Sequence, residues 1–523
     1  MSNVEVLLQT YNDKDKRFMQ YDILLARIKT IQERKRNDPT QKPWADLEDI
    51  AYTHKLSFVR ATFMPFCPIA YIYNKAQKQA GDLIFGNTIT YNIPINGHFI
   101  GDCVFNVQFS TAQTVDFGAP ATQPKDMIRY CNLPAAKLFK KVELLLNGVT
   151  NCSFTRNNFM HFLDFELPVE KKEQWMIMLG NEKKYEGEVS PFPGFAELRR
   201  KDMYGIGAQT FKTRQDALDL YYPLIFWFNN FSNQVLANKI LDKIGIRVTL
   251  DLIQNLIERQ IIVVPVGAPP YPDIYPNQYG SVASSNGSVT YPTITSMDMY
   301  FKEIYVSREI YECYVKTKAF DVVSTWFEDN IPISSTNGSL PLNARDWPIE
   351  RIYFSFQTDR VANNMQLWNK GYAYEHQEVS EFMSWPNPGA PPTYITETRL
   401  STFWKEIQPI ISLKVKTHSI TYYDTFNSSF FNIYDPVMDN RIKKDKNGNM
   451  MLCFDFEPNN PDGLSGYAST ANNVDFMLEY VSNLYSDTTP VFSPSNTGYL
   501  RVSYKIINVL LIDDKLLELR FPN

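Results

Sequence analysis

The sequence predicts an all-β fold in which two β-sandwiches, of about eight strands each, follow one another along the chain. The composition is one observation: the 523 residues include 35 Phe, 31 Tyr and 32 Pro against 22 Gly, and aromatic side chains fit the half-buried surface of a sheet. The other is a pattern that occurs twice, in which an aromatic strand, an Asn-containing turn and a spacer precede an alternating strand. It covers residues 226–250 and 454–478, and 20 residues separate Phe228 from Val248 and also Phe456 from Phe476.

Residues 1–48 form an N-terminal arm that differs from the rest of the chain. Between residues 13 and 36 apolar side chains recur at steps of three and four among basic ones, which predicts an amphipathic helix. The helix either packs on its own domain or docks on a partner protein or an anionic membrane surface, and the sequence favours neither. The candidate interaction residues of the arm are Phe18, Tyr21, Leu24, Leu25, Ile28, Ile31, Arg34, Lys35 and Arg36.

The first sandwich is expected over residues 49–264, where the hydrophobic period changes to two. Strands are predicted at residues 56–63, 88–93, 99–109, 141–146, 223–228 and 246–252. The pairs Asn96-Gly97 and Asn147-Gly148 fit tight turns with positive φ. Two segments, 157–165 and 170–179, indicate short helices or irregular insertions in the loops.

A stretch rich in Pro, Gly and Ser at residues 265–295 is the expected linker, so the second sandwich is predicted over residues 296–523. Its strands are predicted at residues 297–306, 315–323, 351–356, 411–418, 451–456, 474–480 and 500–511. The basic cluster Arg441-Lys443-Lys444-Lys446 indicates an exposed hairpin tip.

Composition and motifs argue against most catalytic and nucleic-acid-binding functions. A formal charge of −5 provides no general attraction to polyphosphate. The five histidines form no metal-binding motif, and the nucleophile, phosphate and dinucleotide motifs of common enzymes do not occur. We therefore expect no catalytic residues, no metal and no cofactor. The acidic pairs Asp164-Glu166 and Glu303-Glu312 are interpreted as solvated charges rather than as glycosidase carboxylates.

The cysteines and tryptophans are interpreted as packing residues. Six scattered cysteines without a CxxC pair indicate small buried side chains in a reducing compartment. The N-terminal residues do not resemble a secretory signal, so synthesis in the cytosol is expected. The tryptophans of the second half favour a core or subunit contact over a sugar site.

The order of short motifs resembles the major capsid (hexon) protein of African-swine-fever-like large DNA viruses, over nearly the whole chain from Thr53. The motifs, in order, are Thr53-His54, Phe58, Phe63, Pro65, Pro68, Tyr73-Asn74-Lys75, Gly86-Asn87, Ile93-Pro94, Tyr130-Cys131, Pro134, Asn147-Gly148, Phe226-Trp227-Phe228-Asn229, Tyr305-Val306, Glu309-Ile310, Trp347-Pro348-Ile349 and Lys416-Thr417-His418.

The resemblance implies two eight-stranded jelly rolls standing side by side, with three chains closing into a pseudo-hexagonal homotrimer that tiles an icosahedral shell. It also implies a protein made in the host cytoplasm and located in the virion capsid. Its partners would be neighbouring capsomers, with minor capsid proteins or the internal viral membrane at the arm. Two alternatives remain open. One is a membrane-shaping scaffold of the same fold that is later shed, as in poxvirus-type relatives, and the other is a carbohydrate-binding or glycoside-hydrolysing β-sandwich protein.

Overall fold

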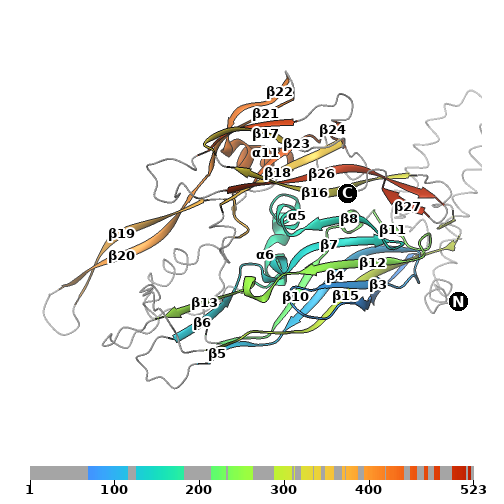
Figure 1. The fold of residues 1–523 in the computed structure, drawn as a ribbon, viewed down its shortest axis with the longest axis horizontal. Coiled ribbons are helices and arrows are strands. Elements are labelled where there is room, and N and C mark those ends of the chain that lie inside the picture. Colours follow the sequence, from blue (N-terminus) through green and yellow to red (C-terminus); the bar gives the residue numbers. More distant parts are fainter. Residues whose placement is uncertain are drawn as a thin grey trace, which may run out of the picture.

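The computed structural model of the chain (Figure 1) describes residues 69–115, 125–181, 212, 214–230, 234–262, 288–308, 311–312, 320–333, 335–342, 348–358, 368–371, 373–386, 394–417, 420–440, 448–455, 465–468, 476–482, 498–513 and 516–519. Several predictions concern residues outside these ranges: the arm over residues 1–48 with its interaction residues, the strand at 56–63, most of the expected linker, and the basic cluster at 441–446.

The first sandwich consists of two antiparallel sheets. Sheet 1 has the strand order β1 (Ile69–Lys75), β15 (Ile294–Val306), β4 (Phe99–Phe109) and β10 (Leu218–Pro223), with β11 (Leu236–Ala237) also paired to β4. Sheet 2 has the order β2 (Gln77–Ala80), β3 (Thr88–Ile93), β12 (Ile244–Leu250), β7 (Phe139–Leu146) and β8 (Val149–Thr155).

The second sandwich is built in the same way. Sheet 3 has the order β16 (Phe320–Ile333), β26 (Gly498–Asp513), β18 (Pro348–Thr358) and β23 (Met450–Cys453), with β24 (Tyr467–Ala468) paired to β18 and β27 (Leu516–Leu519) paired to β26. Sheet 4 has the order β17 (Asn337–Leu342), β25 (Phe476–Ser482), β21 (Ile410–Thr417) and β22 (Ile420–Asn427).

The two sandwiches share one topology. If β1, β3, β4, β7, β8, β10, β12 and β15 are counted as strands one to eight, strand one pairs with eight, eight with three and three with six in sheet 1. In sheet 2, strand two pairs with seven, seven with four and four with five. The strands β16, β17, β18, β21, β22, β23, β25 and β26 repeat each of these pairings. This is the eight-stranded jelly-roll arrangement, so the predicted fold class is confirmed. The repeated sequence pattern marks the region of strands six and seven in each half.

One predicted strand belongs to the other sandwich. The strand expected at residues 297–306 as the start of the second sandwich is β15, which is hydrogen-bonded between β1 and β4 in the first. Residues 288–290 (β14) also pair with a strand of the first half, β5 (Ala112–Val115). The Pro-, Gly- and Ser-rich stretch therefore connects strand seven to strand eight of the first sandwich and is not the linker between the sandwiches. The prediction failed because the composition of a loop indicates a long connection but not which strands it joins. The other domain limits remain predictions.

The aromatic segment at residues 223–228 is a second correction. Strand β10 ends at Pro223, and Trp227–Asn230 form the short helix α8. Proline has no N–H to continue the ladder, and residues 224–228 are all buried rather than alternately buried and exposed. The Asn147-Gly148 turn is confirmed, since both residues have positive φ, 51° and 87°, as a two-residue hairpin turn requires. Neither Asn96 nor Gly97 is among the described residues with positive φ.

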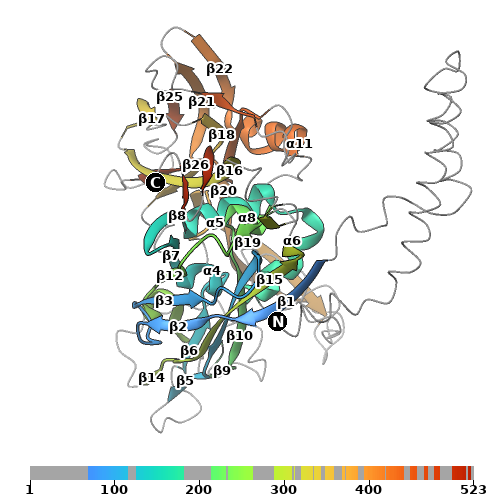
Figure 2. The same cartoon turned by 90° about the vertical axis from the view of Figure 1, so that its right-hand side faces the viewer.

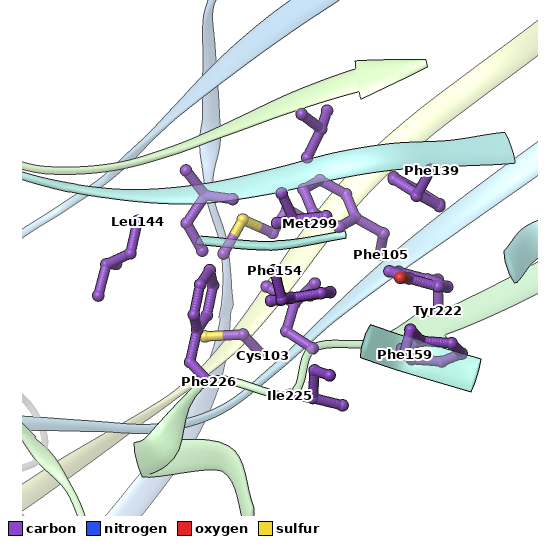
Figure 3. Close-up of a cluster of buried hydrophobic side chains, with 14 of the residues drawn as sticks. Cys103, Phe105, Phe139, Leu144, Phe154, Phe159, Tyr222, Ile225, Phe226 and Met299 are labelled. Carbon is purple, nitrogen blue, oxygen red and sulfur yellow. The ribbon is translucent and has the colours of Figure 1, made fainter. Parts of the chain in front are cut away.

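The two sandwiches have separate interiors. In the first, the ring of Tyr222 stacks between Phe139 and Phe159, with centroid distances of 4.2 and 4.4 Å (Figure 3). In the second, Phe354, Val502 and Leu478 belong to a cluster between sheets 3 and 4. Four of the six cysteines lie in the described residues, and all four are buried and free, as predicted: Cys103, Cys131, Cys152 and Cys453.

Strands that lie outside the four sheets of the sandwiches gather at one end of the molecule, on the left in Figure 1. They come from the long connections of both sandwiches: β5, β6 (Lys125–Tyr130), β9 (Arg214–Gln215), β13 (Ile257–Ile262) and β14 (Ser288–Thr290) from the first, and the hairpin of β19 (Ala373–Pro386) and β20 (Tyr394–Ile407) from the second. Besides α8, the helices among the described residues are α4 (Pro134–Leu138), α5 (Arg156–His161), η2 (Phe162–Glu166), α6 (Val169–Met178), η3 (Ile253–Asn255), η4 (Phe430–Tyr434) and α11 (Asp435–Asn440). Among the described residues, no helix has both the length and the apolar character needed to span a bilayer.

Candidate functional site at the junction of the two sandwiches

The junction begins with the helical connection that follows strand five of the first sandwich. Thr155 caps helix α5, because its hydroxyl accepts a hydrogen bond from the backbone N–H of Asn158 while the Asn158 side chain accepts one from the N–H of Thr155. This reciprocal cap satisfies two backbone donors that a helix start leaves unpaired. The helix then widens into the π-helical turn η2, which ends at Glu166.

This connection covers the outer face of sheet 3. Successive strand residues point to opposite faces of a sheet, so Ile352 and Phe354 of β18 enter the core of the second sandwich while Tyr353 points to the first. The Tyr353 ring stacks on His161 of α5 at 5.6 Å and on Phe165 of η2 at 5.5 Å. Around Tyr353, sheet 3 is thereby buried on both faces.

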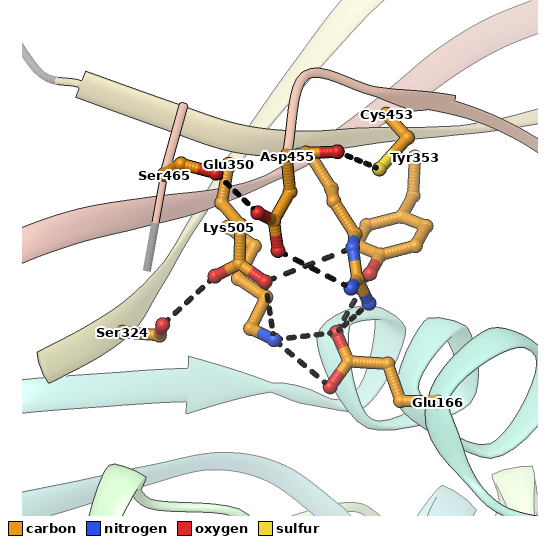
Figure 4. Close-up of polar contacts among 9 residues, drawn as sticks. Glu166, Ser324, Glu350, Tyr353, Cys453, Asp455, Ser465 and Lys505 are labelled. Carbon is orange, nitrogen blue, oxygen red and sulfur yellow. Dashed lines mark hydrogen bonds and ion pairs between the residues drawn. The ribbon is translucent and has the colours of Figure 1, made fainter. Parts of the chain in front are cut away.

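Five charged side chains meet at the centre of the junction (Figure 4), and none of them exposes more than 8% of its surface. The Lys505 ammonium lies 2.9 Å from Glu350 and 3.1 Å from Glu166. The Arg351 guanidinium lies 3.6 to 3.8 Å from oxygens of Glu350, Glu166 and Asp455. We call these five residues the junction cluster.

Neighbouring hydroxyls complete the cluster. Tyr353 donates to Glu166 at 2.6 Å, and Ser324 donates to Glu350 at 2.8 Å. Burial alone would raise the pKa of Glu350, but Lys505 and Arg351 outweigh it and hold that pKa below its ordinary value. Burial also opposes the charge on Arg351, yet Tyr353, Glu350 and Glu166 hold its pKa well above the usual range. Glu350 and Arg351 are therefore both charged at neutral pH.

The cluster is divided unequally between the sandwiches. Arg351 and Lys505 carry two positive charges, Glu350 and Asp455 carry two negative charges, and all four belong to the second sandwich. Glu166 is the fifth member and comes from the first sandwich. Removing Glu166 would leave a neutral set of four, whereas removing either cation would leave an excess of buried negative charge.

Other hydrogen bonds also cross the junction. The Nδ1 atom of His161 lies 2.8 Å from the hydroxyl of Ser503 on β26, and burial, with Arg501 nearby, lowers the pKa of His161 to about 3, so its ring is neutral. Asn449 donates to Asp164 at 2.7 Å. The junction thus combines a charged centre with further hydrogen bonds and stacked rings, an arrangement that holds the two sandwiches in one fixed orientation.

The structure confirms the interpretation of the tryptophans and corrects that of the acidic pairs. Among the tryptophans of the second half, Trp326 and Trp368 are buried, as expected for packing residues. The interpretation of the acidic pairs as solvated was wrong for Asp164, Glu166 and Glu303, which are buried or nearly so, whereas Glu312 exposes 45% of its side chain. Carboxylates are rarely buried without a partner, and the partners of Glu166 come from more than 180 residues further along the chain.

A sequence signal for the junction cluster exists. In β18 the charged pair Glu350-Arg351 is followed by an apolar run, Ile352-Tyr353-Phe354, and in the neighbouring strand β26 Lys505 is followed by Ile506-Ile507. Adjacent charges inside an apolar strand indicate a sheet covered on both faces, with the charges paired across the covering layer. No group of His, Cys, Asp or Glu in the described part of the chain is arranged to hold a metal ion.

The comparisons with known proteins agree with this architecture. No family model matches the chain. It is 22% identical over 645 aligned residues, covering 97% of each protein, to the hexon protein p72 of African swine fever virus isolate Tick/Malawi/Lil 20-1/1983 and to the major capsid protein of isolate Pig/Kenya/KEN-50/1950. These relatives are the ones that the motif order indicated.

Solved structures give the fold. The major capsid protein of Faustovirus superposes with a TM-score of 0.68 at 19% identity, covering 95% of this chain and 99% of that one. The quasi-atomic model of the PBCV-1 virus capsid gives a TM-score of 0.57 at 16% identity, covering 89% and 100%. The chain is therefore similar over almost its entire length to major capsid proteins of large DNA viruses, and its fold is their double jelly roll.

Proposed function

We propose that this chain is the major capsid protein of a large DNA virus, and that it works without catalysis by forming capsomers that tile an icosahedral shell. The observation that carries the proposal is the pair of topologically identical eight-stranded sandwiches, fixed side by side by a buried junction. The similarity to hexon proteins over 97% of both chains supports it.

The geometry suits a homotrimeric capsomer. Three copies of a two-sandwich chain place six similar units around one axis, so one gene product can occupy a hexagonal lattice position. If the two sandwiches could move relative to one another, the distance between them would vary, and the spacing of the lattice would vary with it. The junction cluster and the rings stacked on Tyr353 fix that link within the chain.

The other elements have proposed roles within the capsid. The short strands and the β19–β20 hairpin, gathered at one end, would form the outer surface of the capsomer. The arm over residues 1–48 would lie at the base and contact minor capsid proteins or the internal membrane. Synthesis would take place in the host cytoplasm, with the virion capsid as the final location.

The solution mass of the purified protein tests the proposal. Three chains of 60.6 kDa give about 182 kDa by light scattering, and electron microscopy of concentrated samples should show hexagonal arrays. A monodisperse single chain that binds glycans would contradict the proposal and favour the carbohydrate-binding alternative.

A further inference from the structure

The helical connection between strands five and six occurs in both sandwiches, but only the first copy docks on a sheet of the other sandwich; in the second copy, α11 touches η2 at its edge. In the first sandwich it is α5 with η2, which docks on sheet 3. In the second sandwich it is η4 with α11. Each contains a π-helical turn of five residues, and the turns end at Glu166 and Tyr434.

The docked copy shows which parts of a sheet receive such a connection. Asn157 of α5 bonds to Glu328 on strand one of sheet 3 (β16) and to Arg501 on strand eight (β26). His161 bonds to Ser503, which is paired with Glu328 across those two strands. These bonds lie on the outer face of strands one and eight, beside Tyr353 and Arg351 of strand three, which also face the connection.

The undocked copy presents an apolar stripe. Phe426, Phe430, Tyr434 and Met438 recur every four residues, and the first three rings stack in sequence, with centroids 4.4 and 5.1 Å apart. Tyr434 and Met438 expose 55% and 62% of their surface. A stacked aromatic stripe of this kind is typical of a protein interface.

The equivalent surface in the first sandwich is open and aromatic, with the Lys302 ammonium over the Tyr71 ring at 4.5 Å. On strand one of sheet 1 (β1), Ile69, Tyr71 and Tyr73 alternate with inward residues, and the two tyrosines expose 62% and 56%. Tyr71 is paired with Ile304 and Tyr73 with Lys302 on strand eight (β15). These are the strands that correspond to β16 and β26 in sheet 3.

We infer that the η4–α11 stripe of one chain docks on the outer face of β1 and β15 of a second copy, repeating between chains the contact that α5 and η2 make within the chain. The inference rests on the proposed function and adds the surfaces through which the capsomer closes. Such a contact is heterologous, because different surfaces meet. Figure 2 shows α11 and β1 on the same side of the molecule, as a contact that closes into a ring requires.

Two full-length variants test the inference. The stripe variant carries Tyr434→Asp and Met438→Asp, and the strand variant carries Tyr71→Asp and Tyr73→Asp. Each places charges in the proposed contact at exposed positions, so the fold should be retained, which circular dichroism and the melting temperature check. The control carries Ile84→Asp and Val149→Asp, which alter equally exposed apolar residues outside both surfaces.

Light scattering should give about 182 kDa for the wild type and the control, and about 61 kDa for each variant alone, from a chain mass of 60.6 kDa. An equimolar mixture of the two variants should recover a species of about 121 kDa, from the same chain mass, because the intact stripe of one meets the intact strand surface of the other. A contact between identical surfaces would not give this recovery.

The experiment distinguishes a failure of the inference from a failure of the proposed function. Folded variants that still form the three-chain species would overturn the inference and leave the proposed function standing. Folded single variants with no recovery on mixing would also overturn it. A wild type that stays a single chain under conditions of capsid assembly would overturn the proposed function and the inference together.

Discussion

At the scale of single residues, burial explains both what the sequence revealed and what it concealed. Trp227 and the described cysteines are apolar or weakly polar, and their burial follows from residue type. The same rule predicts that Glu166 and Arg351 are solvated, and it fails because each finds a partner across the junction. Residue type alone does not show such long-range pairing, although the charges within strands β18 and β26 hint at it.

Trp227 tests the packing of the first sandwich. It exposes 3% of its surface and contacts Phe228 edge to face at 5.2 Å. We expect Trp227→Ala to lower the free energy of unfolding by about 3 to 5 kcal/mol, the range for truncating a large buried aromatic side chain. Urea unfolding measures it, and a loss below about 1 kcal/mol would contradict the observed burial.

The unequal division of the junction cluster predicts an order of effects. Glu166→Gln leaves the four charges of the second sandwich balanced, so it should cost about 1 to 3 kcal/mol from weakened hydrogen bonds. Arg351→Met leaves three buried carboxylates facing Lys505 alone, and should cost about 3 to 5 kcal/mol. Urea unfolding of both variants at pH 7.5 checks this order, and an equal or reversed pair of losses would show that the cluster is not balanced as described.

The buried His161 predicts a pH dependence of stability. Its pKa is about 3 in the folded protein and near 6.5 when unfolded, because burial and then Arg501 disfavour the charged ring. Below pH 6.5 the unfolded chain binds a proton that the folded chain does not, so stability falls as the pH falls from 6.5 toward 3. Between pH 7.5 and pH 5 this residue should account for a loss of about 2 kcal/mol.

His161→Gln isolates that contribution, since glutamine does not titrate. The free energy of unfolding of the variant, measured by urea at both pH values, should fall by about 2 kcal/mol less than that of the wild type. Equal losses in the two proteins would mean that the His161 ring is accessible to protons in the folded state. The carboxylates with lowered pKa, such as Glu350, add to the loss in both proteins at still lower pH.

At the scale of elements, hydrophobic period predicts that a strand exists better than it predicts which strand it pairs with. The strands predicted at residues 88–93 and 99–109 have the same limits as β3 and β4. By contrast, β15 was assigned to the second sandwich, because its alternation is equally compatible with either core. Pairing between strands distant in sequence depends on the whole topology, which local pattern does not contain.

The N-terminal arm remains the element whose role depends on experiment. Deletion of residues 1–48 should leave both sandwiches folded and the capsomer intact, because the described strands of both sandwiches lie between residues 69 and 519. Binding to anionic liposomes or to minor capsid proteins should be lost. Sedimentation with anionic liposomes measures the membrane binding. The matched control is a full-length chain in which Gln replaces the basic residues of the arm. Loss of the folded state on deletion would show that the arm belongs to the core.

At the scale of the whole molecule, the two sandwiches form one packed unit rather than two independent domains joined only by a linker. The tandem arrangement was predicted from the sequence, whereas the tight junction was not. Side chains of sheet 3, among them Trp326, Tyr353 and Met451, belong to the same hydrophobic cluster as the core of the first sandwich. The other face of that sheet belongs to the core of the second. Neither sandwich can therefore unfold without exposing a surface that the other one buries.

This shared sheet predicts a single cooperative unfolding transition for the chain. The calorimetric enthalpy should equal the van't Hoff enthalpy if both sandwiches unfold together. Scanning calorimetry under conditions that keep the protein as a single species measures both values. Arg351→Met should lower the temperature of that one transition without splitting it, because the buried rings around Tyr353 still join the sandwiches. Two separate transitions in the wild type would show that the junction contributes little to stability, and the fixed spacing of the two sandwiches would then need another source, such as contacts between chains.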